Sequence, residues 1–292
     1  MSETSRRRQN MKVGIVGSGL MGSGIAEACA RASLDVVISE VSDELITKGR
    51  ARIERSLDRA VERGKLEAAD RDTALARIRF TTDLTDMHDR QIVIEAATEH
   101  EATKLGIFSS LDEIVEATDA ILASNTSSIP IARLGRATRR PESVIGIHFF
   151  NPVPVMQLVE VTPSILTSKE TIAGADAFAG DVLGKKVIHA KDQAGFIVNA
   201  LLIPMLLNAI RMVESGLATA EEIDTGVVEG LRHPMGPLTL TDFVGLDTTK
   251  YVADVLYEEF KNPSFAAPPL LVRMVEAGLL GKKSGKGFYD YS

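Results

Sequence analysis

Residues 11–40 read MKVGIVGSGLMGSGIAEACARASLDVVISE, and this stretch decides the fold of the first half of the chain. A short apolar run at 13–16 leads directly into Gly17-x-Gly19-x-x-Gly22 and then into a helix-compatible segment. Gly17 permits a tight strand-to-helix turn, Gly19 lets the backbone approach a pyrophosphate, and Gly22 allows close packing of helix on strand. The helix N-terminus then faces the phosphate charge. The order of strand, glycines and helix therefore predicts a nucleotide-binding turn.

A second apolar run follows the helix and ends in Glu40, 18 residues after Gly22. At about this spacing a carboxylate accepts hydrogen bonds from an adenosine ribose. It would repel a 2′-phosphate, so Glu40 favours NAD over NADP, although neighbouring cations can offset that repulsion. A lone glycine motif also fits an ordinary turn, but here strand, glycines, helix, second strand and acid coincide. We predict a dinucleotide site formed by Gly17, Gly19, Leu20, Met21, Gly22 and Glu40.

Length, composition and charge narrow the class of protein. A chain of 292 residues is too long for one mononucleotide-binding half and suits two domains. A net charge of −7 argues against a nucleic-acid partner. The single cysteine, Cys29, excludes a disulfide framework and fits a reducing compartment, which we expect to be the cytoplasm. Residues 1–10 predict a disordered tail without a targeting signal, and no apolar run is long enough to span a membrane.

Apolar β-like runs alternate with helical patterns up to about residue 190, and helical spacing alone follows. This order predicts an α/β fold: a Rossmann-like, doubly wound and mostly parallel sheet domain over 11–190, then an all-helical domain over 191–292. The strand candidates after residue 40 are 79–82, 92–96, 120–124, 144–149, 156–161 and 186–189, and the main helix candidates are 43–63, 104–116, 194–214, 220–230 and 247–260.

Ligands of open α/β sheets collect at the carboxyl ends of the strands, so polar residues there are candidates for chemistry. His148 and His189 each lie near the end of a predicted strand, and Glu160 follows His148 after a proline-rich turn. A carboxylate beside a histidine raises the basicity of the imidazole and fixes its orientation, as a proton-transferring base requires. A histidine at a strand end is also often a packing residue, and Glu160 is equally consistent with a solvated acid. Composition and spacing leave the choice between His148 and His189 open.

Seven stretches, spread over residues 11–292, resemble the 3-hydroxyacyl-CoA dehydrogenase family in its short, single-function form. They are GSGLMGSGIA from residue 17, IEAATE at 94–99, ASNTSS at 123–128, IGIHFFNPVPVMQLVEV at 145–161, AGFIVNALL at 194–202, MGPLTLTDFVGLDT at 235–248 and GKGFYDY at 285–291. The resemblance implies a Rossmann-like domain, a helical domain used for homodimerisation, and oxidation of (S)-3-hydroxyacyl-CoA with NAD. It leaves open the acyl chain length, the direction, and whether the pathway is fatty-acid oxidation, butanoate synthesis or polyester storage.

The resemblance also assigns roles by position. It implies that His148 is the catalytic base, that Glu160 is its acidic partner, and that Ser127 and Asn199 hold the substrate oxygen. Without it, Ser127 fits a cap of the following helix equally well. No metal is required, and no cluster with ligand spacing is visible.

Further positions match the family's cofactor and CoA contacts. For the cofactor these are Glu99, Lys104 and Asn125, and for the acyl-CoA they are Ser56, Arg63 and Asn151. A solvated charge pair and a solvated helix face are alternatives for Glu99–Lys104 and for the basic stripe around Arg63. Glu40 stands where the family often has Asp, and Thr98-Glu99-His100 departs from the more usual apolar-Glu-Asn.

Two other functions remain open on the sequence. A lens crystallin with L-gulonate dehydrogenase activity shares the histidine motif, so a sugar acid or other hydroxy acid is an alternative substrate. A non-catalytic dinucleotide-binding protein is the alternative from a different class. The joint presence of His148, Glu160, Ser127 and Asn199 argues against the latter, because a binder needs none of them together.

Overall fold

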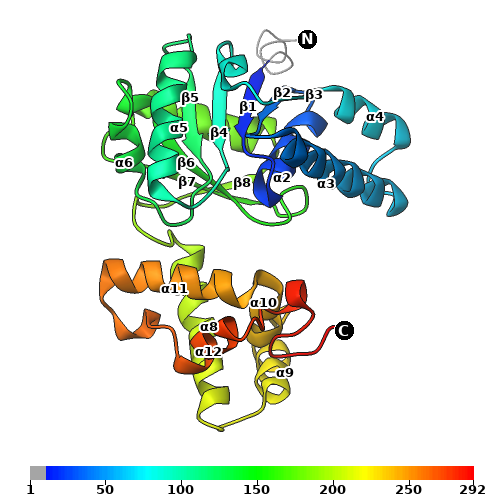
Figure 1. Ribbon diagram of the computed structural model, residues 1–292, viewed down its shortest axis with the longest axis vertical. Helices are drawn as coiled ribbons and strands as arrows, with labels where there is room; N and C mark the ends of the chain where they lie inside the picture. Colours follow the sequence, from blue (N-terminus) through cyan, green and yellow to red (C-terminus); the bar gives the residue numbers. More distant parts are fainter. Residues whose placement is uncertain (1–10) are drawn as a thin grey trace. The chain divides into compact units, whose positions relative to one another are not determined.

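The computed structural model describes residues 11–292, so the tail expected at 1–10 lies outside the described residues. The chain divides into two compact units, the first ending at Asp192 and the second comprising Gln193–Ser292. Sequence patterning predicted the division near residue 190. Each unit is shown in Figure 1 and is described by itself.

The first unit is built on an eight-stranded sheet with the order β3-β2-β1-β4-β5-β6-β7-β8. All neighbouring strands are parallel except β6 and β7, which pair antiparallel. The reversal of strand order between β1 and β4 marks the place where open α/β sheets bind their ligands. The strands are β1 (Lys12–Val16), β2 (Asp35–Ser39), β3 (Ile78–Thr81), β4 (Ile92–Glu95), β5 (Ile121–Ser124), β6 (Val144–Phe149), β7 (Leu158–Pro163) and β8 (Lys186–His189).

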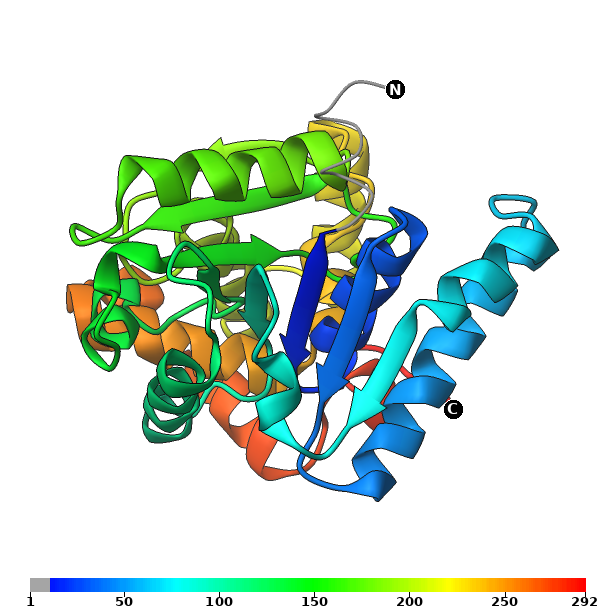
Figure 2. The ribbon, with the colours of Figure 1, turned by 90° about the horizontal axis from the view of Figure 1, so that it is seen from above.

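Helices cover both faces of this sheet, as Figure 2 shows. Side chains alternate along the strands, so Ile15 and Ile94 belong to one apolar core and Val93 and Leu122 to the other. The first core includes residues of α2, α3, α4 and α7, and the second includes residues of α5 and α6. The α-helices of this unit are α2 (Leu20–Arg31), α3 (Asp43–Glu62), α4 (Ala68–Ala76), α5 (Glu101–Ile114), α6 (Ile131–Arg136) and α7 (Lys169–Asp176). Two 3-10 helices, η1 (Leu84–Met87) and η2 (Pro141–Ser143), and a π-helix, η3 (Ala177–Val182), complete it.

The second unit is helical and has its own core, which includes Ile203, Leu207, Leu246 and Leu256. Its helices are α8 (Val198–Glu214), α9 (Ala220–Leu231), α10 (Pro237–Val244), α11 (Leu246–Phe260) and α12 (Pro269–Glu276), with short turns η4 (Pro263–Phe265) and η5 (Lys282–Ser284). The Rossmann-like class and the helical second half predicted from the sequence are confirmed.

Two buried carboxylates hold the C-terminal segment of the second unit. Asp242 accepts the backbone N–H groups of Phe288 and Tyr289, both at 2.9 Å, and Asp224 accepts the Tyr289 hydroxyl at 2.9 Å. Burial and the neighbouring Asp224 raise the pKa of Tyr289 well above its ordinary value, so this hydroxyl remains a donor. The GKGFYDY stretch at 285–291 is therefore docked on the helices of the second unit.

Candidate active site

The glycine turn joins β1 to α2 and lies against the end of β4. Gly17 has a φ of 99° and donates its N–H to the Ser39 carbonyl at 2.8 Å. A Cβ on Gly17 would lie 2.6 Å from the Ala97 Cα, and a Cβ on Gly22 would overlap the Gly17 carbonyl oxygen. Gly19, by contrast, has nothing within 4 Å of the position of a Cβ. The turn therefore has two glycines that the protein itself requires and a third that leaves open space beside the N-terminus of α2, where a pyrophosphate fits.

Glu40 follows the end of β2 and is tied to the same turn. Its carboxylate accepts the Ser18 N–H at 2.7 Å, the Ser18 hydroxyl at 2.9 Å and the Val41 N–H at 2.9 Å. The Arg52 guanidinium on α3 donates to the Ser18 carbonyl at 3.0 Å. The carboxylate is thus held beside the glycine turn, where it can accept hydrogen bonds from the ribose hydroxyls of a bound adenosine.

His148 and Glu160 are direct neighbours across the antiparallel pair β6 and β7. They are register partners, and the His148 Nδ1 lies 2.8 Å from the Glu160 carboxylate, with both side chains buried. A carboxylate at this position orients the imidazole and leaves Nε2 as the nitrogen that can exchange a proton. Phe150 packs on the His148 ring with a centroid distance of 4.7 Å.

His189 does not belong to this group. β8 runs parallel to β7 and therefore opposite to β6, so its carboxyl end lies at the other edge of the sheet from that of β6. The exposed His189 ring pairs instead with Asp176 at 2.8 Å. The hypothesis that His189 lies at the same carboxyl edge of the sheet as His148 was wrong, because the sequence pattern does not show the reversal of direction at β7.

Asn125 connects the ends of β5 and β6. Its side-chain amide oxygen accepts the Phe149 N–H at 2.8 Å, and its backbone N–H donates to the Glu95 carbonyl at 2.8 Å. The Asn125 side chain, for which we expect a contact with the cofactor, therefore also holds the backbone of Phe149, the residue after His148.

Glu99 gathers the polar residues that follow β5. One carboxylate oxygen accepts the Ser127 N–H at 2.7 Å, the Thr126 hydroxyl at 2.9 Å and the Ser127 hydroxyl at 3.2 Å. The α6 N-terminus is capped by Asp192, whose carboxylate accepts the Ile131 and Ala132 N–H groups at 2.7 and 2.9 Å. Ser127 is therefore not the cap of α6, which was the alternative left open by the sequence.

Lys104 on α5 is buried, and its ammonium bridges two carboxylates. It lies 2.5 Å from Glu95 and 3.3 Å from Glu99. Glu95 also accepts the Ser124 hydroxyl at 2.8 Å. The predicted Glu99–Lys104 pair is present, but Glu95 and Ser124 were not singled out, although both stand in the quoted motifs. The sequence does carry one signal for Glu95, because it is a carboxylate at the end of an apolar strand.

The two residues expected to contact CoA lie on or just after α3. Ser56 is half-buried and hydrogen-bonds to Glu27, whose pKa is raised by burial and lowered in part by Ser56 and Arg31. Arg63 follows the last residue of α3 and is exposed. Arg63 therefore presents its charge to solvent, while Ser56 has a protein partner.

Asn151 is exposed in the loop between β6 and β7, which contains the cis bond Asn151–Pro152. Lys185, which the sequence analysis did not single out, donates to the Val153 and Met156 carbonyls of this loop at 2.6 and 2.7 Å. Burial and the charge of Arg31 lower the pKa of Lys185. The loop after His148 is thus fixed from the side of β8.

Asn199 belongs to the second unit. It is the second residue of α8 and is half-buried, so it lies in the first turn of the helix. The helix predicted over 194–214 begins only at Val198. Within residues 11–292 there is no group of three His, Cys, Asp or Glu side chains placed to hold a metal ion, and no helix long and apolar enough to cross a membrane.

A Rossmann-like domain with this glycine turn, an acid after its second strand and a polar cluster beyond β4 to β6 defines an NAD-dependent oxidoreductase. Residues 12–193 match the profile described as 3-hydroxyacyl-CoA dehydrogenase, NAD binding domain, and residues 195–291 match 3-hydroxyacyl-CoA dehydrogenase, C-terminal domain. The chain belongs to the 3-hydroxyacyl-CoA dehydrogenase family, which confirms the resemblance seen in the sequence.

Full-length relatives agree with this assignment. The chain is 58% identical over 280 residues to a Mycobacterium tuberculosis protein named 3-hydroxybutyryl-CoA dehydrogenase, covering 96% of this chain and 98% of the relative. A Deinococcus radiodurans protein named probable 3-hydroxybutyryl-CoA dehydrogenase is 47% identical over 281 residues, covering 96% and 100%. The crystal structure of (S)-3-hydroxybutyryl-CoA dehydrogenase from Ralstonia eutropha matches with a TM-score of 0.90 at 48% identity, covering 96% and 99%.

Proposed function

We propose that this protein interconverts (S)-3-hydroxyacyl-CoA and 3-oxoacyl-CoA with NAD, and that its substrate is the short-chain 3-hydroxybutyryl-CoA. The names of the full-length relatives support the substrate, because they cover nearly the whole chain at 47–58% identity. The observation that carries the chemistry is the buried His148–Glu160 pair, 2.8 Å apart, near the carboxyl end of β6.

His148 is the proton-transfer base in this proposal. NAD, when bound, accepts the hydride from C3, and the C3 hydroxyl must lose its proton as the carbonyl forms. His148 takes that proton on Nε2, and Glu160 stabilises the imidazolium that results. In the reductive direction the same imidazolium returns the proton.

Ser127 and Asn199 orient the C3 oxygen. Glu99 holds the Ser127 backbone N–H at 2.7 Å, and the Ser127 hydroxyl, 3.2 Å from the same carboxylate, turns from Glu99 to donate to the developing carbonyl oxygen. Asn199 contributes an amide donor from the first turn of α8. Arg63, Ser56 and Asn151 bind the CoA part, with the exposed guanidinium of Arg63 meeting a phosphate.

A steady-state assay tests the substrate. We expect acetoacetyl-CoA to be reduced with NADH at a higher kcat/KM than 3-oxoacyl-CoA of longer chain, and L-gulonate to be oxidised poorly with NAD. Faster turnover of L-gulonate than of 3-hydroxybutyryl-CoA would place the protein with the sugar-acid enzymes. Binding of NADH without turnover of any of these compounds would favour the non-catalytic alternative.

Replacement of Glu40 tests the cofactor preference. We expect Glu40→Ala to weaken NADH binding roughly 10- to 100-fold, because a charge-assisted hydrogen bond to the ribose is lost. NADPH binding should improve, because the repulsion of its 2′-phosphate is relieved. Glu40→Gln is the matched control, since it removes the charge and keeps an acceptor for the Ser18 N–H. Fluorescence titration with both cofactors measures the change, and equal affinity of the unmodified protein for NADH and NADPH would contradict the role of Glu40.

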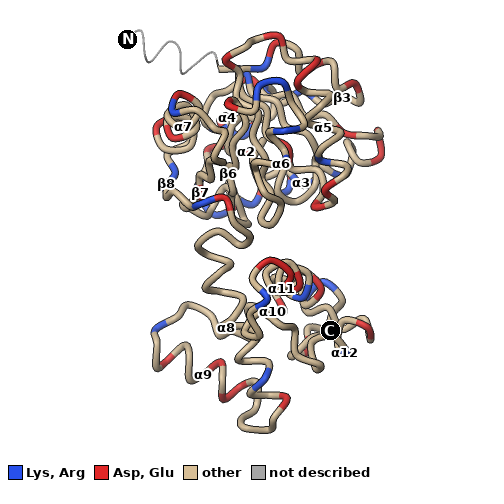
Figure 3. The backbone as a smooth tube through the Cα atoms, turned by 90° about the vertical axis from the view of Figure 1, so that its left-hand side faces the viewer, with Lys and Arg blue, Asp and Glu red and all other residues tan. Residues whose placement is uncertain are grey.

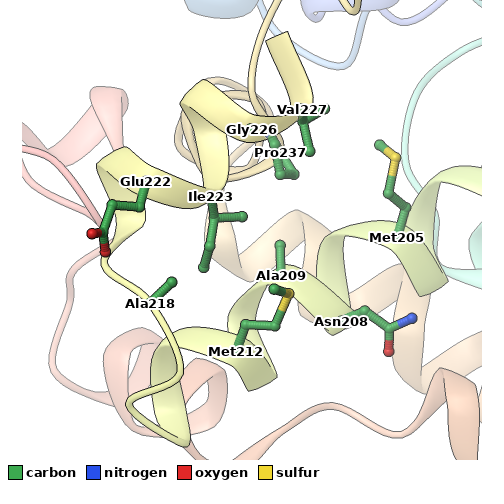
Figure 4. Close-up of a pocket in the computed structure, with 10 residues that line it drawn as sticks. All are labelled: Met205, Asn208, Ala209, Met212, Ala218, Glu222, Ile223, Gly226, Val227 and Pro237. Carbon is green, nitrogen blue, oxygen red and sulfur yellow. The ribbon is translucent and has the colours of Figure 1, made fainter. Parts of the chain in front are cut away.

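We also propose that the second unit forms a homodimer. A groove of about 610 Å³ runs between α8 and α9 (Figure 4). Figure 3 shows α8 as almost uncharged, and Leu201 on this helix is 73% exposed. A helix that exposes apolar side chains and carries charge only near its C-terminal end, at Arg211 and Glu214, fits the same surface on a second copy. The groove is lined by Met205, Asn208, Ala209, Met212, Ala218, Glu222, Ile223, Gly226, Val227 and Pro237.

A charge placed in this groove should dissociate the dimer. We expect light scattering to give a dimer at micromolar concentration and Met212→Glu to give a monomer, because a buried unpaired carboxylate is costly to desolvate. Leu166→Glu is the control, since Leu166 is 38% exposed, close to the 37% of Met212, but lies in the first unit. A monomeric unmodified protein, or a Met212→Glu protein that remains dimeric, would exclude this surface.

A further inference from the structure

Two carboxylates, the buried Glu95 and the partly exposed Glu99, share one ammonium group where β4 meets α5. We call Glu95, Lys104 and Glu99 the buried triad. Glu95 and Lys104 are both buried, and Glu99 is partly exposed beside Ser127. With its groups in their ordinary ionised forms the triad carries a net charge of −1. Such a charge is felt more strongly here than at the surface, because the surroundings screen it less than water does.

The triad lies on the same face of the sheet as His148. Glu95 pairs with Ser124 on β5, and Ser124 pairs with Gly146 on β6, two residues before His148. Paired residues share a face, and so do residues two apart on one strand. Two strand spacings separate β4 from β6, so Glu95 lies about 10 Å from the β6 backbone near His148.

The position of the nicotinamide relative to the triad follows from the ends of the dinucleotide. The adenosine ribose is fixed at Glu40 after β2, and the pyrophosphate at the glycine turn after β1, which touches Ala97 after β4. The nicotinamide must reach the carbon whose hydroxyl meets His148 on β6. Its path from β1 to β6 therefore crosses the ends of β4 and β5, where the triad lies.

We infer that Glu95, through the net negative charge it gives the buried triad, makes the site bind oxidised NAD more tightly relative to NADH than it otherwise would. The nicotinamide ring carries a positive charge when oxidised and none when reduced. A fixed negative charge nearby therefore lowers the free energy of one form and leaves the other almost unchanged. Glu95 touches no ligand in this proposal, so it is a positioning residue that acts through its charge.

A structural role for Glu95 makes a different prediction. Glu95 also accepts the Ala97 N–H at 2.8 Å and the Ser124 hydroxyl. If it only held this loop, its loss would weaken the binding of NAD and NADH by the same factor. The ratio of the two dissociation constants separates the alternatives.

The experiment measures Kd for NADH by fluorescence titration and for NAD by competition, in the full-length protein. Glu95→Gln changes the net charge of the triad from −1 to zero, and we expect Kd(NAD)/Kd(NADH) to rise about tenfold, the size of one charge at ~10 Å in a medium of intermediate dielectric constant. Glu142→Gln is the matched control. Glu142 is exposed in η2, before the start of β6, so this variant loses the same charge at the opposite edge of the sheet and should leave the ratio unchanged.

A charge-restoring variant completes the test. Glu95→Gln with Lys104→Met returns the triad to −1, and we expect the ratio to return toward that of the unmodified protein although more contacts are lost. If Glu95→Gln does not fold, Glu99→Gln makes the same charge change at a more exposed residue and should raise the ratio in the same direction. An unchanged ratio in the folded single variant, or a further rise in the double variant, would overturn the inference.

The inference rests on the proposed function only in placing the nicotinamide near His148. The two can fail separately, because the ratio is a binding measurement that needs no turnover. A His148→Gln protein with full activity would refute the proposed base. An unchanged ratio in Glu95→Gln together with an inactive His148→Gln protein would refute only the role of the triad.

Discussion

His148→Gln is expected to lower turnover by roughly 10²- to 10⁴-fold, the usual contribution of a general base. Glutamine keeps a polar side chain of similar length but cannot take up the proton of the C3 hydroxyl at neutral pH. NADH affinity should change little, because we propose that the dinucleotide is held elsewhere, by the glycine turn after β1 and by Glu40 after β2. Stopped-flow reduction of acetoacetyl-CoA and fluorescence titration with NADH measure the two quantities separately.

Two companion variants make this prediction specific. His189→Gln should retain normal turnover, because His189 is exposed and paired with Asp176 at the other edge of the sheet. Glu160→Gln should also slow turnover, since it keeps a hydrogen bond to His148 but removes the charge that stabilises imidazolium. The double variant should be little slower than the slower single variant, because both residues act on one proton. Multiplicative losses, or an inactive His189→Gln protein, would show that the base has been misassigned.

Gly22→Ala is expected to impair both folding stability and cofactor binding. Its Cβ would overlap the Gly17 carbonyl oxygen, so the turn and α2 must separate. Overpacking of this kind costs about 1–3 kcal/mol, which lowers Tm by several degrees in a protein of this size. A displaced turn also loses one or two charge-assisted hydrogen bonds to the pyrophosphate, so NADH affinity should fall roughly 10²- to 10³-fold. Calorimetry and NADH titration check both effects.

Gly19→Ala separates the loss of NADH affinity from the loss of folding stability, which Gly22→Ala is expected to cause together. Gly19 has a φ of −63° and open space at its Cβ position, so the variant should melt at the normal temperature. Its methyl group would nevertheless occupy the side from which a pyrophosphate approaches, and NADH binding should weaken. Gly106→Ala, in α5 with nothing within 4 Å, is the control and should leave NADH affinity unchanged. Normal stability and normal NADH affinity in Gly22→Ala would refute this account of the turn.

The fold could be predicted from the sequence to within a few residues at most strand ends, because each strand is a short apolar run beside a turn or a helical pattern. The 144–149 and 186–189 runs are strands with those bounds. Strand direction was not predictable, because the pairing of β6 with β7 depends on how a proline-containing loop folds back. The location of His189 depended on that direction.

The part of the candidate site whose residues lie close together in the sequence was predictable. The glycines and Glu40 lie within one βαβ unit, whose spacing is fixed by the fold. Glu95, Ser124 and Lys185 were missed because each has a partner in a distant part of the chain. Glu95 meets Ser124, which is 29 residues later, and Lys185 meets a loop 29 or more residues earlier. Side-chain pairing of this kind is set by packing and has no period in the sequence.

The antiparallel pairing of β6 and β7 has a consequence for how this chain tolerates change. His148 and Glu160 meet because they are opposite one another in a ladder, so their encounter is set by the ladder and not by the number of residues in the loop between them. We therefore expect the two side chains to stay together when that loop is lengthened or shortened by a residue. An insertion of one residue inside β7 before Glu160 would be far more damaging, because alternate residues point to opposite faces and the carboxylate would be turned away from the imidazole. The number of residues between Glu160 and the rest of its strand therefore matters more for this pair than the length of the loop.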